Sequence, residues 1–239
     1  GEIFGGVILQ NLERTDYLPL PSLEADRGLY RVRISNELKE RQYTDFANLI
    51  AINHPEGTQA LVDNQGKAHI ISNLQAPVVA LTANDHSVLS VLEQTDRALH
   101  YFNEEGMAKN NIELTFDNRA KSKSGKLVIN AKNTMWFDYL YGEVISKFGN
   151  YYPTWIEKQA KLSAEERLEK IKASGAPLSV YLKSGDSWAL IEQINTIGPM
   201  ADRDMVIPLD LSHNEGNEVQ IKIETGFMFW ELDYAAVDF

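Results

Sequence analysis

The stretch EVQIKIETG, residues 218–226, decides the fold class of this chain because apolar and polar side chains alternate along it. Successive side chains of an extended backbone point to opposite faces, so Val219, Ile221 and Ile223 share one face. The polar residues between them share the other face. This two-residue period predicts a β-strand with one buried and one solvated side.

The sequence on both sides of this stretch repeats the pattern. The run MVIPLDLS at 205–212 alternates in the same way, and Thr225-Gly226 is a turn signal before the final run FMFWELDYAAVDF at 227–239. Other strand-like runs lie at 6–12, 30–34, 46–52, 99–102, 112–116, 127–131 and 178–190, with a hairpin at 59–71 whose turn is 63–66. A short helix capped by Asp85 is expected to extend to about Glu93. Many short strands separated by turn signals indicate a sandwich or a barrel.

The period changes to that of a helix between residues 134 and 175. Apolar residues spaced by four, Trp136, Leu140, Val144 and Phe148, form one broad helix face with Phe137, Tyr141 and Ile145 beside them. We expect Trp136 and Tyr141 to pack this helix against the sandwich.

The boundaries of the helices are marked by capping residues. Gly149 is suited to end the first helix, and Pro153 is suited to the first turn of a second one. Ser163 and Glu166 have the spacing of a capping box, and Gly175 is suited to close the helix that follows.

Together these patterns predict a mainly β fold: a jelly-roll-like antiparallel β-sandwich with an inserted helical segment at about 134–175. The simplest organisation is a single domain over 1–239. Because a connection of about 40 residues is long, the alternative is two β domains, 1–133 and 176–239, joined by helices.

Composition limits the partners and the location of the protein. The net charge of −11 repels phosphate backbones, so no nucleic-acid partner is expected. Apolar runs such as 76–81 are far shorter than the ~20 residues of a membrane span, and the absence of cysteine removes disulfides and thiol chemistry. The chain begins with Gly1 rather than Met, which we interpret as a truncation after a signal or anchor segment. We therefore expect a bacterial protein that is secreted, periplasmic or on the cell surface.

The C-terminal runs at 205–212, 218–226 and 227–239 resemble the end of a galactose-binding-like jelly roll. In that family an aromatic-rich final strand carries an acidic residue and a D-x-x-x-V close, and Asp233 and Val237 stand at those places here. The resemblance implies a sandwich of the kind that serves in binding modules, adhesion domains and enzyme accessories. Such sandwiches often hold a structural Ca²⁺ on carboxylate and carbonyl oxygens. The candidate donors here are Asp202, Asp204, Asp210 and Asp233.

Aromatic residues gather around the helical segment and suggest a glycan site. Sugar rings stack their apolar C–H faces on flat aromatic side chains, while carboxylates and amides bind the hydroxyl groups. The candidate ligand-binding residues are Tyr139, Tyr151, Tyr152 and Trp155, with Asp138 as a polar partner. The alternative is that these rings only pack the helices.

No hydrolase, zinc-protease or nucleotide-binding motif occurs, and the five histidines show no ligand-like spacing. Paired carboxylates for acid–base work are Asp138 with Glu143 and Glu231 with Asp233. Asp138 and Glu143 do not share a helix face well, whereas Glu231 and Asp233 would point the same way on a strand.

Three functions are compatible with these sequence features. The sequence does not indicate an oligomeric state. The leading hypothesis is a non-catalytic exported module that binds a glycan or a protein partner, without an assigned catalytic residue or cofactor apart from the possible structural calcium. The alternatives are a carbohydrate-active hydrolase that uses paired carboxylates, and a structural domain of a larger extracellular protein.

Overall fold

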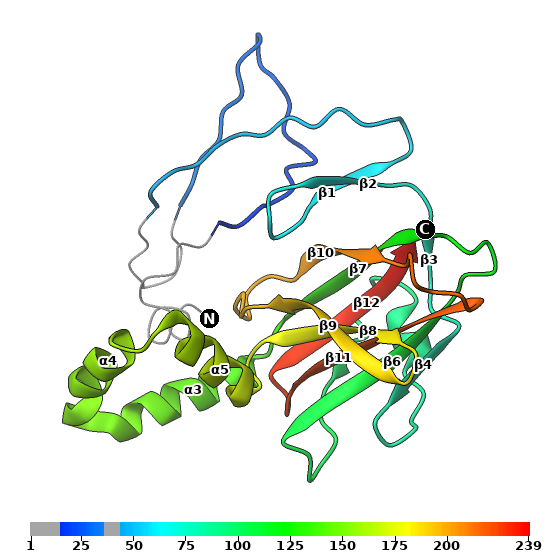
Figure 1. Cartoon of the computed structure of the whole chain (residues 1–239). Coiled ribbons are helices and arrows are strands. Elements are labelled where there is room, and N and C mark those ends of the chain that lie inside the picture. Colours follow the sequence, from blue (N-terminus) through cyan, green and yellow to red (C-terminus); the bar gives the residue numbers. More distant parts are fainter. Residues whose placement is uncertain (1–14, 36–43) are drawn as a thin grey trace.

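The computed structural model describes residues 15–35 and 44–239 and shows a mainly β protein with a helical segment between two strands (Figure 1). Two antiparallel five-stranded sheets form a sandwich, so the predicted fold class is confirmed. No helix in the described residues is long and apolar enough to cross a membrane.

The first sheet, called the β7 sheet, has the strand order β10-β7-β12-β3, and β5 also pairs with β12. Its strands are β3 (Leu74–Gln75), β5 (His100–Tyr101), β7 (Ser124–Asn133), β10 (Arg203–Asp210) and β12 (Trp230–Asp238). The second, called the β11 sheet, has the order β4-β6-β11-β8-β9. Its strands are β4 (Val79–Thr82), β6 (Lys109–Asp117), β8 (Leu178–Ser184), β9 (Ser187–Ile194) and β11 (Glu218–Gly226).

The core lies between the inner faces of these sheets. It contains the alternating residues of the opening stretch, Val219, Ile221 and Ile223, together with Leu127 and Trp230 from the β7 sheet. Strands from before and after the helical segment therefore contribute to the same buried cluster. Burial of these apolar side chains supplies the main stabilising contribution to folding.

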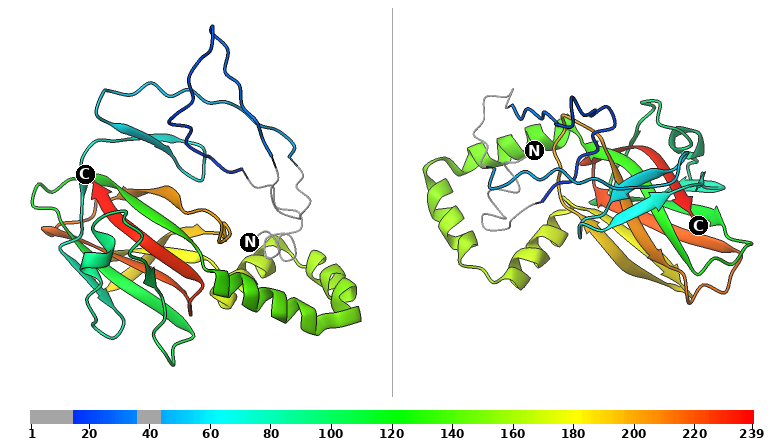
Figure 2. Two further views of the ribbon diagram at one scale, coloured as in Figure 1. Left: turned by 180° about the vertical axis from the view of Figure 1, so that it is seen from behind. Right: turned by 90° about the horizontal axis from the view of Figure 1, so that it is seen from above.

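A hairpin covers the outer side of the β7 sheet, as Figures 1 and 2 show. Its strands are β1 (Gln59–Val62) and β2 (Ala68–Ile71), which confirms the hairpin predicted at 59–71. Leu61 and Ile71 form a second buried cluster with Val128 and Val206, which point outward from the sheet. This cluster gives the β7 sheet a protected outer face.

The helices extend from one end of the sandwich (Figure 2). They are α3 (Met135–Phe148), the short 3₁₀ helix η1 (Gly149–Tyr151), α4 (Tyr152–Ala160) and α5 (Ala164–Ser174). Thr134 caps α3 through the N–H of Phe137, and Ser163 and Glu166 form the predicted capping box of α5. The glycines predicted to end two helices, Gly149 and Gly175, both have positive φ.

The junction after α5 requires a glycine because two backbones meet there. The N–H of Gly226 donates to the carbonyl of Gly175 (2.8 Å), and a Cβ on Gly175 would lie 3.1 Å from the Gly226 Cα. The indole of Trp230 donates to the next carbonyl, that of Ala176 (2.7 Å). These contacts fix the end of the helical segment to β11 and β12.

Of the two side chains predicted to pack α3 against the sandwich, Tyr141 is buried as expected, whereas Trp136 is not. The Trp136 side chain is 41% exposed, whereas Phe137 and Tyr141 are buried. Phe137 lies 4.7 Å from the Phe229 ring, measured between centroids. The spacing of four correctly identified an apolar helix face. Its buried side is formed by Phe137 and Tyr141, each of which follows directly after a residue of the row that begins at Trp136.

Two strand predictions near the N-terminus are wrong. Residues 30–34 and 46–52 are irregular, and the alternating apolar side chains at Tyr30, Val32 and Ile34 are exposed. Alternation assigns side chains to faces but supplies no hydrogen-bonding neighbour, and a strand needs one. The strand predicted at 6–12 lies outside the described residues.

The predicted helix after Asp85 is shorter than expected. It is α2 (Leu89–Leu92), and Val88 precedes it without a side-chain cap. Asp85 instead has a positive φ in the turn after β4, where its N–H donates to the Thr82 carbonyl. The final strand also starts later than predicted, at Trp230, because 227–229 form the turn.

Candidate functional site

The outer side of the β11 sheet carries the candidate site. Leu178 and Val180 point into the core, so the alternate residues Ser179 and Tyr181 point to the outer side of the sheet, where Ser179 is buried and Tyr181 is partly exposed. We call the following outward side chains the open face: Lys109, Ser179, Tyr181, Lys183, Trp188, Leu190, Gln193, Lys222 and Glu224. Leu190 is 43% exposed, so solvent reaches this surface.

The strand register brings two aromatic rings onto neighbouring strands. Tyr181 of β8 lies opposite Lys222 of β11, and Lys183 of β8 lies opposite Trp188 of β9. The Lys222 ammonium lies 4.7 Å from the centre of the Tyr181 ring and 5.0 Å from that of Trp188. Both distances lie within the range of cation–π attraction.

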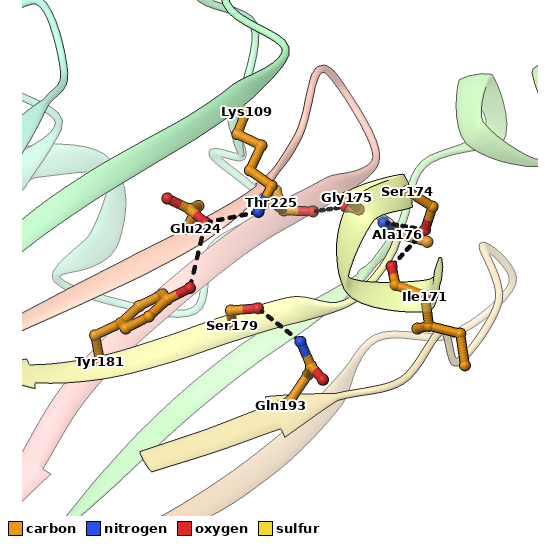
Figure 3. Close-up of polar contacts among 10 residues, drawn as sticks. All are labelled: Lys109, Ile171, Ser174, Gly175, Ala176, Ser179, Tyr181, Gln193, Glu224 and Thr225. Carbon is orange, nitrogen blue, oxygen red and sulfur yellow. Dashed lines mark hydrogen bonds and ion pairs between the residues drawn. The ribbon is translucent and has the colours of Figure 1, made fainter. Parts of the chain in front are cut away.

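Hydrogen-bonding groups lie near the Tyr181 ring, as Figure 3 shows. The Tyr181 hydroxyl donates to Glu224 Oε1 (3.3 Å), and the Lys109 ammonium donates to the same oxygen (3.3 Å). On the other side of β8, Gln193 Nε2 donates to Ser179 Oγ (3.3 Å). Carboxylate, amide, hydroxyl and ammonium groups therefore lie on the same face as the aromatic pair.

The electrostatic environment keeps the Tyr181 phenol protonated. Partial burial raises its pKa, and the negative charge of Glu224 raises it further. Because the ordinary pKa of tyrosine is already about 10, the hydroxyl is a hydrogen-bond donor at neutral pH. Its donation to Glu224 fixes the orientation of the ring edge.

The end of the helical segment lies close to this sheet in Figure 3. Thr225 Oγ1 of β11 donates to the Gly175 carbonyl (3.1 Å), and the Ala176 N–H donates to Ser174 Oγ (3.2 Å). Ser174 Oγ in turn donates to the Ile171 carbonyl (2.6 Å). This network holds the start of β8, and with it Ser179 and Tyr181, in register with β11.

The aromatic residues predicted to bind a ligand lie on α3, η1 and α4 in separate groups. Tyr152 and Trp155 stack on each other with 6.1 Å between centroids, and Phe148 packs on Trp155 at 4.7 Å. Both predicted residues are half-buried. This group has the geometry of rings that pack two helices together.

Tyr139 and Tyr151 do not join that group. Tyr139 is 61% exposed and contacts Trp136, with 6.1 Å between centroids. Tyr151 accepts a hydrogen bond from Lys158 Nζ (2.8 Å). Asp138 is partly buried in the first turn of α3, where a carboxylate interacts favourably with the helix dipole.

The predicted metal ligands lie in three places. Asp202 and Asp204 both accept from Asn130 Nδ2, at 3.2 and 2.7 Å. Asp210 accepts from the Ser212 N–H (2.9 Å), and Asp233 accepts from the Arg97 N–H (3.0 Å). In the part of the chain that the structure describes, no three histidine, cysteine, aspartate or glutamate residues form a metal-binding group. A structural calcium stays a prediction, with Asp202 and Asp204 as the two candidates that lie together.

The predicted carboxylate pair Glu231 and Asp233 does not share a strand face. A β-bulge lies between Leu232 and Tyr234, and a bulge breaks the alternation that the prediction assumed. Glu231 is buried in an ion pair with Lys132 (3.0 Å), and Asp233 binds the backbone of the α2–β5 loop. Both carboxylates have structural partners in the folded protein.

The sequence prediction missed the open face, although the signal for it was present. Val180 and Ile221 identify core strands through their alternation, and the residues between them were predicted only to be solvated. Tyr181, Lys222 and Glu224 occupy those intervening positions. That β8 and β11 are neighbours follows from the register and from no pattern within either strand.

No protein-family model matches this chain, and no curated protein matches it. Among solved structures, the CBM22-1 xylan-binding domain of Xyn10C from Paenibacillus barcinonensis is similar to this chain at 10% sequence identity. The match covers 69% of this chain and 96% of that domain, with a TM-score of 0.25. A superposition this loose carries no argument about ligand, so the function is inferred from the open face.

Proposed function

We propose that this protein is a non-catalytic, exported β-sandwich module that binds a glycan on its open face. The observation that carries the proposal is the pair of outward aromatic rings, Tyr181 and Trp188, on adjacent strands. Tyrosine and tryptophan combine apolar faces with a polar edge and are enriched where binding surfaces stay in contact with water. A sugar ring presents the complementary surface, with apolar C–H groups on its faces and hydroxyls around its edge.

The polar groups of the open face support the same ligand. Glu224 offers carboxylate oxygens as acceptors, and the Gln193 amide offers both a donor and an acceptor. These groups are positioned by strands that share a hydrogen-bonded register, so little conformational entropy is lost when they bind. We also propose that the resemblance of the C-terminal strands to the galactose-binding-like family reflects a binding module of that kind.

The test is affinity electrophoresis of the protein in gels that contain soluble plant, algal and bacterial polysaccharides. We expect at least one polysaccharide to retard the wild type. Trp188→Ala should weaken this binding by about tenfold or more, because a central aromatic anchor contributes upward of ~1.4 kcal/mol. Its melting temperature should stay close to that of the wild type because Trp188 lies outside the core.

Trp155→Ala is the matched comparison, since it removes the same side chain from the helical segment. If Trp155→Ala binds glycan as the wild type does and Trp188→Ala loses binding, the result supports the open face as the binding site. The reverse result would place the binding site at Tyr152 and Trp155 on α4. Absence of retardation by every polysaccharide would reject the proposed function.

A further inference from the structure

Two lysines on the open face share one tryptophan. Lys183 Nζ lies 4.8 Å from the centre of the Trp188 ring, and Lys222 Nζ lies 5.0 Å from it. Lys222 also lies over Tyr181. The rings hold two positive charges close together on one side of the sheet.

Lys183 and Lys222 form cation–π contacts rather than ion pairs, although Glu113 of β6 stands opposite Lys222 in the strand register. Lys126 pairs with Asp238 (2.9 Å) and Lys132 with Glu231 (3.0 Å), while Lys109 pairs with Glu224 (3.3 Å). Within residues 15–35 and 44–239, neither Lys183 nor Lys222 forms an ion pair with a carboxylate. A protein with a net charge of −11 has many carboxylates that could have neutralised them.

We infer that the open face selects an acidic glycan, and specifically one whose sugar rings carry carboxylate groups, such as a polyuronate. This inference rests on the proposed function and specifies its ligand class. The ligand carboxylate draws the ammonium groups of Lys183 and Lys222 away from the Trp188 ring and contacts them, and the sugar ring takes their place against Trp188. Charge-assisted hydrogen bonds of this kind are stronger than bonds between neutral groups.

The surrounding charge favours a uronate over a densely sulfated chain. A uronate carries one negative charge per ring, which two ammonium groups can balance. Glu224 lies beside Tyr181 on the same face, and the net negative charge of the protein repels a ligand with several charges per ring. The electrostatic field at the open face therefore attracts a moderately charged glycan and repels a highly charged one.

The experiment compares isothermal titration with a defined oligogalacturonate, a neutral oligosaccharide of equal length, and a heavily sulfated one. The wild type should bind the oligogalacturonate most tightly. Its affinity should fall as sodium chloride is raised from 20 to 500 mM, because salt screens exposed charges. The double variant Lys183→Met/Lys222→Met should lose about tenfold or more in this affinity.

The matched control is Lys161→Met, which removes an exposed lysine at the end of α4, outside the open face. It should leave the affinity for the oligogalacturonate unchanged, and melting temperatures should show that all variants fold. Equal binding of the neutral and uronate ligands, or tighter binding of the sulfated one, would overturn the inference.

The outcomes separate this inference from the proposed function. If a neutral glycan binds and Trp188→Ala abolishes that binding, the module binds glycans on the open face and the uronate selectivity is wrong. If the uronate binds and Trp188→Ala has no effect, the open face is not the site and both statements fail.

Discussion

The two outer faces of the sandwich differ in what their strands carry and in what covers them. The β7 sheet points Val128 and Val206 outward, and the β1–β2 hairpin buries them beneath Leu61 and Ile71. The β11 sheet instead points aromatic rings and lysines outward, and these remain in contact with solvent. The comparison shows that a cluster of outward aliphatic side chains is covered, whereas a face that mixes rings and lysines, with Leu190 among them, stays in contact with water.

The largest effect on stability should follow from removing a contact of the covered face. Leu61→Ala deletes most of a buried side chain, so unfolding or local detachment of the hairpin should become easier by about 2–5 kcal/mol. Urea unfolding measures the global change, and hydrogen exchange at 59–71 measures detachment of the hairpin. Unchanged exchange at 59–71 would contradict the role given to this cluster.

Acid should loosen the covered face by protonating two carboxylates that hold it. Burial raises the pKa of Asp63, but hydrogen bonds from His69 and from the backbone of Lys67 and Gln65 outweigh this effect and lower it. The pKa of Asp238 is likewise lowered, because Lys126 and two backbone N–H groups outweigh the effect of burial.

A lowered folded pKa means that the folded state binds protons less readily than the unfolded chain. Its stabilising contribution is present above the unfolded pKa of about 4 and is lost as pH falls through the lowered folded value. Hydrogen exchange at 59–71 between pH 5 and 2 should show this loss. Asp63→Asn should weaken the hairpin at neutral pH by about 1–3 kcal/mol and reduce its sensitivity to acid.

His100 acts over a different pH range and must be separated from these carboxylates. Burial lowers its pKa to about 4, so the folded protein keeps it neutral while the unfolded chain protonates near pH 6.5. Its effect on stability therefore develops as pH falls from 6.5 to 4. Loss of hairpin protection confined to that upper range would contradict the assignment to Asp63 and Asp238.

The smallest effect should come from Leu190→Ala on the open face, which is the same substitution as Leu61→Ala on the covered one. Leu190 is exposed, so the free energy of unfolding should change by no more than about 0.5 kcal/mol. A loss comparable to that of Leu61→Ala would show that the open face is covered in solution, and the contrast between the faces would disappear.

Much of the fold was predictable because local physics specifies it. The alternation of Val219, Ile221 and Ile223 identified β11, and the capping pair Ser163 and Glu166 identified the start of α5. The failures occurred where a neighbour decides the outcome. Residues 30–34 alternate as well as β11 does, yet they pair with no sheet, and Trp136 lies on the apolar stripe of α3 without docking.

The candidate site was less predictable than the fold. The aromatic residues on the helices were conspicuous in sequence because they are close together, but Tyr152 and Trp155 pack on each other. Tyr181 and Lys222 are separated by some forty residues and meet only through the pairing of β8 with β11. That the whole chain unfolds as one domain stays a prediction.

The amino-acid sequence by itself indicated most of the strands of the sandwich, the long helices, and which side of the core strands avoids water, because these depend on side-chain periodicity and caps. Only the tertiary structure decided which strands are neighbours and which outer face receives the hairpin. Those choices depend on long-range pairing and on the fit of buried surfaces, which no local pattern contains. The cluster of Tyr181, Trp188 and the two lysines exists only as a result of that pairing.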